Sequence, residues 1–111
     1  MLHRANRIVT GADYRRVVRR GKRTAGALTV VHIQSTDEGA PARFGFIVSR
    51  AVGNAVHRNR VRRRLKAVSH GVLVEGLAGV DVVIRALPAS AQADWSTLSA
   101  EVEQAMHRSR P

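Results

Sequence analysis

The spacing of apolar residues predicts that the chain opens with a helix over residues 10–21. Thr10 followed three residues later by Asp13 is typical of a helix start. Apolar residues then recur at helical spacing, and Gly21 is suited to end the helix. The outward side of this helix is expected to carry Arg15, Arg16, Arg19 and Arg20. The pattern therefore indicates an amphipathic helix with a cationic outer side.

Two stretches rich in β-branched and apolar residues follow, at 27–35 and 43–49, and they predict two strands. Between them, Asp37, Gly39 and Pro41 are typical of a turn or loop. The second stretch is apolar almost throughout, so we expect it to be covered on both faces. We expect the two strands to pair as a hairpin.

A long helix is predicted after the dipeptide Gly53-Asn54, which indicates a turn. Asn54 is suited to cap a helix that begins at Ala55. Apolar residues then form one narrow stripe that must face the core: Val61, Leu65, Val68 and Val72.

The remaining pattern predicts a third strand at 81–87, stopped by Pro88, and a last helix capped by Asp94. The buried side of that helix is expected to consist of Trp95, Leu98, Val102 and Met106. The order helix, two strands, helix, strand, helix predicts an α/β sandwich with helices on a small sheet.

The composition fits one globular domain over residues 1–111. Of 111 residues, 44% are hydrophobic, which is enough for one modest core. There is no cysteine, so neither a disulfide nor a thiolate metal site can form. The apolar runs are too short to span a bilayer, and basic and polar residues interrupt the first nine positions, unlike a secretory signal. We therefore expect a cytoplasmic protein with no membrane partner.

The charge indicates a polyanionic partner. Nineteen Lys and Arg residues stand against eight Asp and Glu residues, which gives a formal net charge of +11. The charges are segregated, since no acid lies between Glu38 and Glu75. Arginine outnumbers lysine, and two explanations stay open: a G+C-rich genome, or the suitability of the guanidinium group for phosphate.

The strongest local signal is the segment 50–66, RAVGNAVHRNRVRRRLK, which contains seven basic residues and no acid. With Val61 and Leu65 facing inward, Arg58 and Arg64 flank the apolar stripe. The opposite side of the helix is then occupied by Asn59, Arg60, Arg62, Arg63 and Lys66. This helix is expected to present a continuous cationic surface to its partner.

Two features favour RNA over sequence-specific DNA as that partner. A reader of DNA base edges mixes Asn, Gln, Ser and Arg on its recognition helix, whereas almost every outward residue here is suited to phosphate. No strand has the aromatic pattern of the RNP type, on which single-stranded bases stack. We therefore expect RNA binding through the backbone, and no DNA partner.

The sequence gives no reason to expect a catalytic residue or a metal held by the protein alone. Its five histidines are scattered without metal-ligand spacing, and its acids do not cluster as two-metal phosphodiester chemistry requires. If the chain serves an enzyme, the reactive centre is expected to lie in its partner.

Three segments together resemble the protein component of bacterial ribonuclease P. The segment 48–66, VSRAVGNAVHRNRVRRRLK, is similar to the signature of that family, with Arg58-Asn59-Arg60 as its specific core. The segments 4–23 and 81–90 resemble the opening helix and the last strand of the family. The resemblance covers most of the chain.

The resemblance implies a fold and a role. The fold is an αβββαβα sandwich, with one strand more than the residues themselves indicate and a left-handed βαβ crossover. The family pairs with a large catalytic RNA, and the particle removes the 5′ leader of precursor tRNA. Hydrolysis occurs at Mg²⁺ held mainly by the RNA, while the protein helps to hold the leader and strengthens productive metal binding.

The resemblance also implies site residues. Those facing the catalytic RNA are Arg58, Asn59, Arg60, Arg62 and Arg63, supported by Arg50, Asn54 and Lys66. The leader is expected in a cleft between the first helix and the sheet, at Tyr14, Val18 and His32. Many relatives have an aromatic residue in place of Val18, and some have Tyr in place of His32, so leader stacking at these two positions is an open question. Val56 and Val61 are expected to serve packing.

Two other function classes remain as alternatives. A small basic ribosomal protein or an RNA chaperone would show the same segregated charge, and only the Arg58-Asn59-Arg60 frame separates them from the leading interpretation. A stand-alone nuclease is disfavoured, because the carboxylate cluster that it would need is missing.

Overall fold

The computed structural model describes residues 2–108. Its helices, 3₁₀ turns (η) and strands follow one another as η1 (Arg4–Asn6), α1 (Gly11–Arg20), β1 (Lys22–Ala25), β2 (Thr29–Ser35), β3 (Arg43–Ile47), η2 (Arg50–Val52), α2 (Ala55–Val74), β4 (Val80–Ala86), η3 (Pro88–Ala91) and α3 (Trp95–Arg108). Without the 3₁₀ turns this is the αβββαβα order that the resemblance implies, and that prediction is confirmed.

One four-stranded mixed sheet runs in the order β1-β2-β4-β3. β2 pairs antiparallel with both β1 and β4, whereas β3 and β4 are parallel. The parallel pair is connected through α2, which makes β3, α2 and β4 a βαβ unit. The left hand of this crossover stays a prediction from the family.

The predicted hairpin between the strands at 27–35 and 43–49 is wrong, because β4 lies between β2 and β3. Every residue of β4 except Arg85 is buried. A strand with so much apolar surface is most stable in the interior of a sheet, paired on both edges. Burial therefore outweighs the proximity of β2 and β3 along the chain.

Two further differences from the prediction concern strand β1 and the first turn of helix α3. The residues of β1, Lys-Arg-Thr-Ala, are mostly exposed and show no apolar alternation, so only the resemblance implies this strand. Trp95 does not belong to the buried side of the last helix, since it is 45% exposed in the first turn of α3. Leu98, Val102 and Met106 are fully buried, as predicted.

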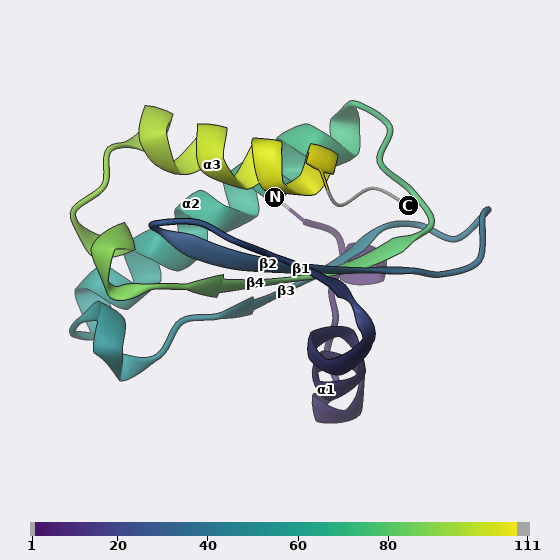
Figure 1. Ribbon diagram of the computed structural model, residues 1–111, viewed down its shortest axis with the longest axis horizontal. Coiled ribbons are helices and arrows are strands. Elements are labelled where there is room, and N and C mark those ends of the chain that lie inside the picture. Colours follow the sequence, from purple (N-terminus) through teal and green to yellow (C-terminus); the bar gives the residue numbers. More distant parts are fainter. Residues whose placement is uncertain (1, 109–111) are drawn as a thin grey trace.

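The helices cover the two faces of the sheet unequally. α2 and α3 lie on one face, and α1 lies on the other and covers only part of it (Figure 1). The main hydrophobic core lies under α2 and α3 and contains the predicted stripe Val61, Leu65, Val68 and Val72. A smaller cluster of Ile8, Val17 and Val83 fixes α1 to the opposite face. Among residues 2–108, no helix is both long and apolar enough to cross a bilayer.

Candidate RNA-binding surface

The start of α2 is set by its local sequence. The Oδ1 atom of Asn54 accepts a hydrogen bond from the backbone N–H of His57 at 3.0 Å, which confirms the predicted cap. Gly53 has φ +147°, and a Cβ there would lie 3.0 Å from the Cβ of His57. Only glycine adopts this conformation readily, so Gly53-Asn54 directs the chain sharply from η2 into α2.

The two sides of α2 divide as predicted. The stripe residues are at most 2% exposed, whereas Asn59, Arg60 and Arg63 are exposed. Arg62 and Lys66 are half-buried at the margin, and Arg62 donates a hydrogen bond to Asn59 at 2.9 Å. Val56 is 73% exposed, so the expectation that it serves packing is wrong. The cationic side therefore begins on the first turn of the helix.

Two arginines at the edge of the stripe behave differently from each other. Arg64 donates to the backbone carbonyl of Ala93 at 2.8 Å and so joins α2 to the segment before α3. Arg58 is half-buried, and its Nε has no hydrogen-bond partner among the described residues. Arg50 and Asn54 are exposed on η2 and at the helix start. Arg50, Asn59, Arg60 and Arg63 are thus exposed to a partner.

The cationic side of α2 continues onto the N-terminal segment. A hollow of about 240 Å³ is lined by Arg7, Ile8, Val9, Tyr14, Phe44, Phe46, Arg62 and Lys66. A second hollow of about 350 Å³ is lined by Leu2, Arg7, Arg63 and Lys66. Arg7 and Lys66 border both. We call these two hollows the N-terminal groove; it joins cations from two distant parts of the sequence over an apolar floor.

The N-terminal segment is held in this place by the edge of the sheet. The backbone N–H of Ile8 donates to the carbonyl of Phe44 at 2.9 Å. Arg7 and Phe44 thereby form an isolated parallel β-bridge. Ile8 is also buried in the cluster beneath α1. Nothing in the spacing of apolar residues revealed Arg7 as a site residue, because its position depends on this tertiary pairing.

Tyr14 and Val18 come together as predicted. With Arg15, Arg19 and Ile47 they line a shallow hollow of about 250 Å³ between α1 and the sheet, and Val18 is 39% exposed. The hydroxyl of Tyr14 accepts a hydrogen bond from the backbone N–H of Phe46 at 3.1 Å. Tyr14 therefore lies across β3 and borders both this hollow and the N-terminal groove.

His32 lies apart from that hollow. It is on β2, is only 7% exposed, and does not line the space between Tyr14 and Val18. Burial, followed by the charges of Arg23 and Arg85, holds the pKa of His32 below its ordinary value. The neighbouring arginines could not be recognised from the sequence, because β1 has no strand pattern of its own.

A buried ion-pair network fixes α1 to the sheet. Asp81, which is 1% exposed, accepts two hydrogen bonds from Arg43, Nε to Oδ1 at 2.9 Å and Nη2 to Oδ2 at 2.7 Å. Arg16 of α1 also binds Asp81, and it donates to Asp13 and, at 2.9 Å, to Gln34. The prediction that Arg16 points outward is therefore wrong. Its guanidinium group turns toward the sheet because it pairs there with the buried carboxylate of Asp81.

The charges in this network shift two ionisation equilibria. The hydrogen bond from Arg16, followed by that involving Thr10, lowers the pKa of Asp13. The hydrogen bond with Asp81 raises the pKa of Arg43. Asp13 and Asp81 are thus each paired with arginines. Within residues 2–108, no group of three or more His, Cys, Asp or Glu side chains is arranged to hold a metal ion.

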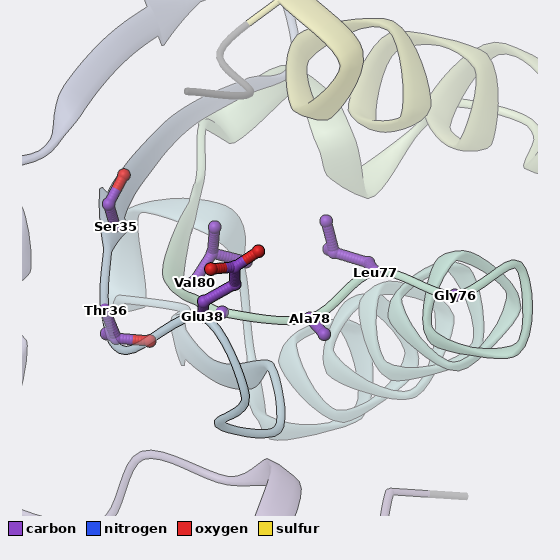
Figure 2. A pocket seen from close by; sticks show the side chains of 8 residues that line it. Ser35, Thr36, Glu38, Gly76, Leu77, Ala78 and Val80 are labelled. Atoms are coloured by element: carbon purple, nitrogen blue, oxygen red, sulfur yellow. The ribbon is translucent and has the colours of Figure 1, made fainter.

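Another hollow, of about 340 Å³, lies at the opposite end of α2 between the loop after β2 and the loop before β4 (Figure 2). Its lining consists of Ser35, Thr36, Glu38 and residues 76–80. The sole ionisable side chain in this lining is the acid Glu38, which disfavours a polyanion. The hollow is therefore not part of the candidate RNA-binding surface.

The close approach of Tyr14 to β3 requires glycine at position 45. A Cβ at Gly45 would lie 2.5 Å from Cε1 of the Tyr14 ring. Gly45→Ala is expected to displace Tyr14 and to lower the free energy of unfolding by about 1–3 kcal/mol, as overpacking does. Gly71→Ala is the control: no atom lies within 4 Å of its added Cβ, so it should stabilise α2 by about 0.5–1 kcal/mol. Urea unfolding measures the free energy of unfolding of both variants. Equal values for the two would mean that the Tyr14 ring can move away from the added Cβ without loss of stability.

Comparisons with known proteins agree with these observations. The family model described as Ribonuclease P matches residues 2–110. A curated ribonuclease P protein component of Clavibacter michiganensis is 52% identical over 108 residues, covering 97% of this chain and 96% of that protein. The corresponding component of Beutenbergia cavernae is 47% identical over 103 residues, covering 93% and 87%. The fold matches the solved RNase P protein of Staphylococcus aureus with a TM-score of 0.83 at 23% identity, covering 96% and 97% of the two chains. The chain therefore belongs to the ribonuclease P protein family.

Proposed function

We propose that the protein is the RNA-binding subunit of a ribonuclease P particle, in which a catalytic RNA removes the 5′ leader of precursor tRNA. The observation that carries this proposal is the acid-free cationic side of α2, which continues through Arg7 into the N-terminal groove in a chain of this family. Such a surface is suited to the backbone of a folded RNA.

The catalytic RNA would contact the exposed side of α2. Arg60, Arg63 and Asn59 project from it, and none of them pairs with an acid within residues 2–108. Arg50 and Asn54 extend the same surface toward η2. Guanidinium groups bind phosphate oxygens in a bidentate manner, so a rigid row of them can fix the orientation of an RNA helix. Arg58 is half-buried at the edge of this surface and would add a further positive charge beside the RNA.

The precursor leader would lie over Tyr14 and Val18. The hydroxyl of Tyr14 is occupied by Phe46, so its ring is held rigidly at the border of both hollows. A base can stack on this ring, whereas Val18 offers only an aliphatic contact. The leader would therefore stack at one position and pack at the other, between the cations Arg15 and Arg19.

Mg²⁺ would be held mainly by the RNA, where it supplies the hydrolytic chemistry. Among residues 2–108 no three His, Cys, Asp or Glu side chains are grouped to hold a metal ion, and Asp13 and Asp81 are each engaged by arginines. The contribution of the protein would be to neutralise phosphates and to hold the leader, which lowers the repulsion that a bound substrate must overcome.

Cleavage of a 5′-extended precursor tRNA at low Mg²⁺ tests the proposal. We would compare the protein alone, a ribonuclease P RNA alone, and the two together. Cleavage that occurs only in the mixture, or far faster there, is the expected result. No enhancement with a cognate RNA would favour a ribosomal or chaperone role instead, and cleavage by the protein alone would show a catalytic site on this chain.

A further inference from the structure

A second group of cations lies on the sheet face that α1 covers only in part (Figure 1). The register of β1 and β2 places Arg23 directly beside His32. On the other side of β2, His32 is opposite Val83, and Arg85 lies two residues further along β4. Side chains two residues apart in a strand share a face, so Arg23, His32 and Arg85 project from the same side of the sheet.

This side is the one that carries α1. Gln34, two residues from His32, accepts a hydrogen bond from Arg16 of α1, and Val83 packs against Val17. The group therefore shares a face with the cleft at Tyr14 and Val18, although it lies apart from their hollow.

The side chains of Arg23, His32 and Arg85 lack an acidic or hydrogen-bonding partner within the described residues. His32 is 7% exposed, and its Nδ1 is buried without a hydrogen-bond partner among residues 2–108. Arg23 and Arg85 are exposed, and neither is in an ion pair among those residues. A buried polar atom left unsatisfied costs free energy, and two arginines beside an imidazole without a counter-charge are suited to an oxyanion.

We propose that Arg23, His32 and Arg85 form a subsite for one backbone phosphate of RNA, and that His32 takes up a proton when this phosphate binds. The inference rests on the proposed function, because it assumes that RNA reaches this face. A phosphate between the arginines would offset one of their two positive charges, and the ring of His32, which is then repelled less strongly, would hold a second proton as a donor to the phosphate.

The charges around His32 explain why its ring takes up a proton when the phosphate binds. Groups facing His32 from the packed elements are Arg23 on β1, Arg85 and Asp81 on β4, and Arg16 on α1, which also carries Arg19 and Arg20 toward its end. Asp81 is neutralised by Arg43 and Arg16. In the free protein, burial and the charges of Arg23 and Arg85 hold the pKa of His32 below its ordinary value, which disfavours the protonated ring. The negative charge of a bound phosphate opposes the charges of the arginines and so raises the pKa of His32.

Calorimetry in two buffers of different ionisation enthalpy measures the protons taken up on binding. In one arm the protein is titrated into the catalytic RNA; in another, the assembled particle is titrated with precursor tRNA or with mature tRNA that lacks the leader. We expect proton uptake near pH 6.5 that His32→Gln abolishes. His107→Gln, an exposed histidine on α3 across the sheet, is the control and should leave uptake unchanged.

The arm that shows His32-dependent uptake identifies the source of the phosphate. Uptake with precursor but not with mature tRNA assigns it to the leader, and uptake in the first arm assigns it to the catalytic RNA. Uptake that persists in His32→Gln, or none in any arm, overturns the subsite. In that case, wild-type enhancement of cleavage would leave the proposed function standing, whereas absence of enhancement would remove both.

Arg85→Ala provides a variant that need not disturb folding, since Arg85 is exposed. It should weaken RNA binding about tenfold, the effect of one charge-assisted hydrogen bond. It should also raise the pKa of His32 in the free protein, measured by NMR of the imidazole ring, because a repelling charge is gone. Arg108→Ala on α3 is the matched control. Arg85→Ala and Arg108→Ala proteins with equal affinities and equal His32 pKa values would contradict the assignment.

Discussion

Replacing Arg60 and Arg63 together with alanine is expected to weaken binding to the catalytic RNA about 100-fold without changing the thermal stability of the protein. Both side chains are exposed on α2, and neither takes part in an ion pair within residues 2–108. Each charge-assisted hydrogen bond to phosphate contributes about 1.5 kcal/mol, so two contribute about 3 kcal/mol. The affinity and the melting temperature are measured on the same preparation.

The salt dependence of binding gives this experiment a second readout. For the wild-type protein the logarithm of affinity should fall steeply with the logarithm of salt concentration, and each lost phosphate contact should reduce the slope by about 0.7 to 0.9. The double variant should therefore lose about 1.5 units of slope. An affinity that falls with an unchanged slope would mean that these arginines contact bases or water and not phosphates.

A control with the same loss of charge separates contact from net charge. Lys22→Ala with Arg108→Ala also removes two cations, and both residues are exposed on β1 and α3, at the sheet edge opposite β3. We expect this control to change the affinity only slightly. If the Arg60 and Arg63 double variant unfolds at a lower temperature than this control, the faces of α2 are misassigned.

The start of α2 and its apolar stripe could be predicted because their signals are adjacent in the sequence. A capping side chain, a glycine with positive φ and an apolar stripe act within a few residues of one another. Each is a property of the helix alone, so the division of α2 into a buried and a cationic side did not depend on the rest of the fold.

The arrangement of the sheet could not be predicted from the residues because strand order depends on distant pairings. β4 separates β2 from β3, and the polar strand β1 is stabilised by hydrogen bonds to β2 and not by its own apolar surface. The resemblance to a family implied β1, whereas spacing did not. Register then decided the surroundings of His32, which is why its two arginines became visible only in the structure.

The orientation of Arg16 shows the same limit at the level of one side chain. Helical spacing places it among the outward arginines of α1, with Arg15, Arg19 and Arg20. A carboxylate buried in β4, 65 residues further along the chain, turns it toward the sheet. A charge pattern predicts which side of a helix is basic, but a tertiary partner determines which of those charges remain free for RNA.

Asp81→Asn is expected to lower the free energy of unfolding by about 3 kcal/mol. The substitution preserves the size of the side chain but removes the charge that Arg16 and Arg43 share. Breaking a buried ion pair from one side costs about 3–5 kcal/mol, because the remaining charge is left without a partner. The effect should fall at the lower end of that range, since both arginines are about one-third exposed and Asp13 still binds them. Urea unfolding at neutral pH measures the difference.

Glu103→Gln is the control for this substitution, because Glu103 is an exposed acid on α3 and should change stability by no more than about 0.5 kcal/mol. Acid unfolding extends the test. The pKa of Asp13 is lowered from 3.8, so its stabilising contribution is complete above pH 3.8 and is lost as the pH falls through the lowered value. An Asp81→Asn protein as stable as the Glu103→Gln protein would mean that the network contributes no more than surface ion pairs do. The position of α1, and with it the cleft at Tyr14, would then depend on the apolar contacts of Val17 and Tyr14 and on the hydrogen bond between the Tyr14 hydroxyl and Phe46.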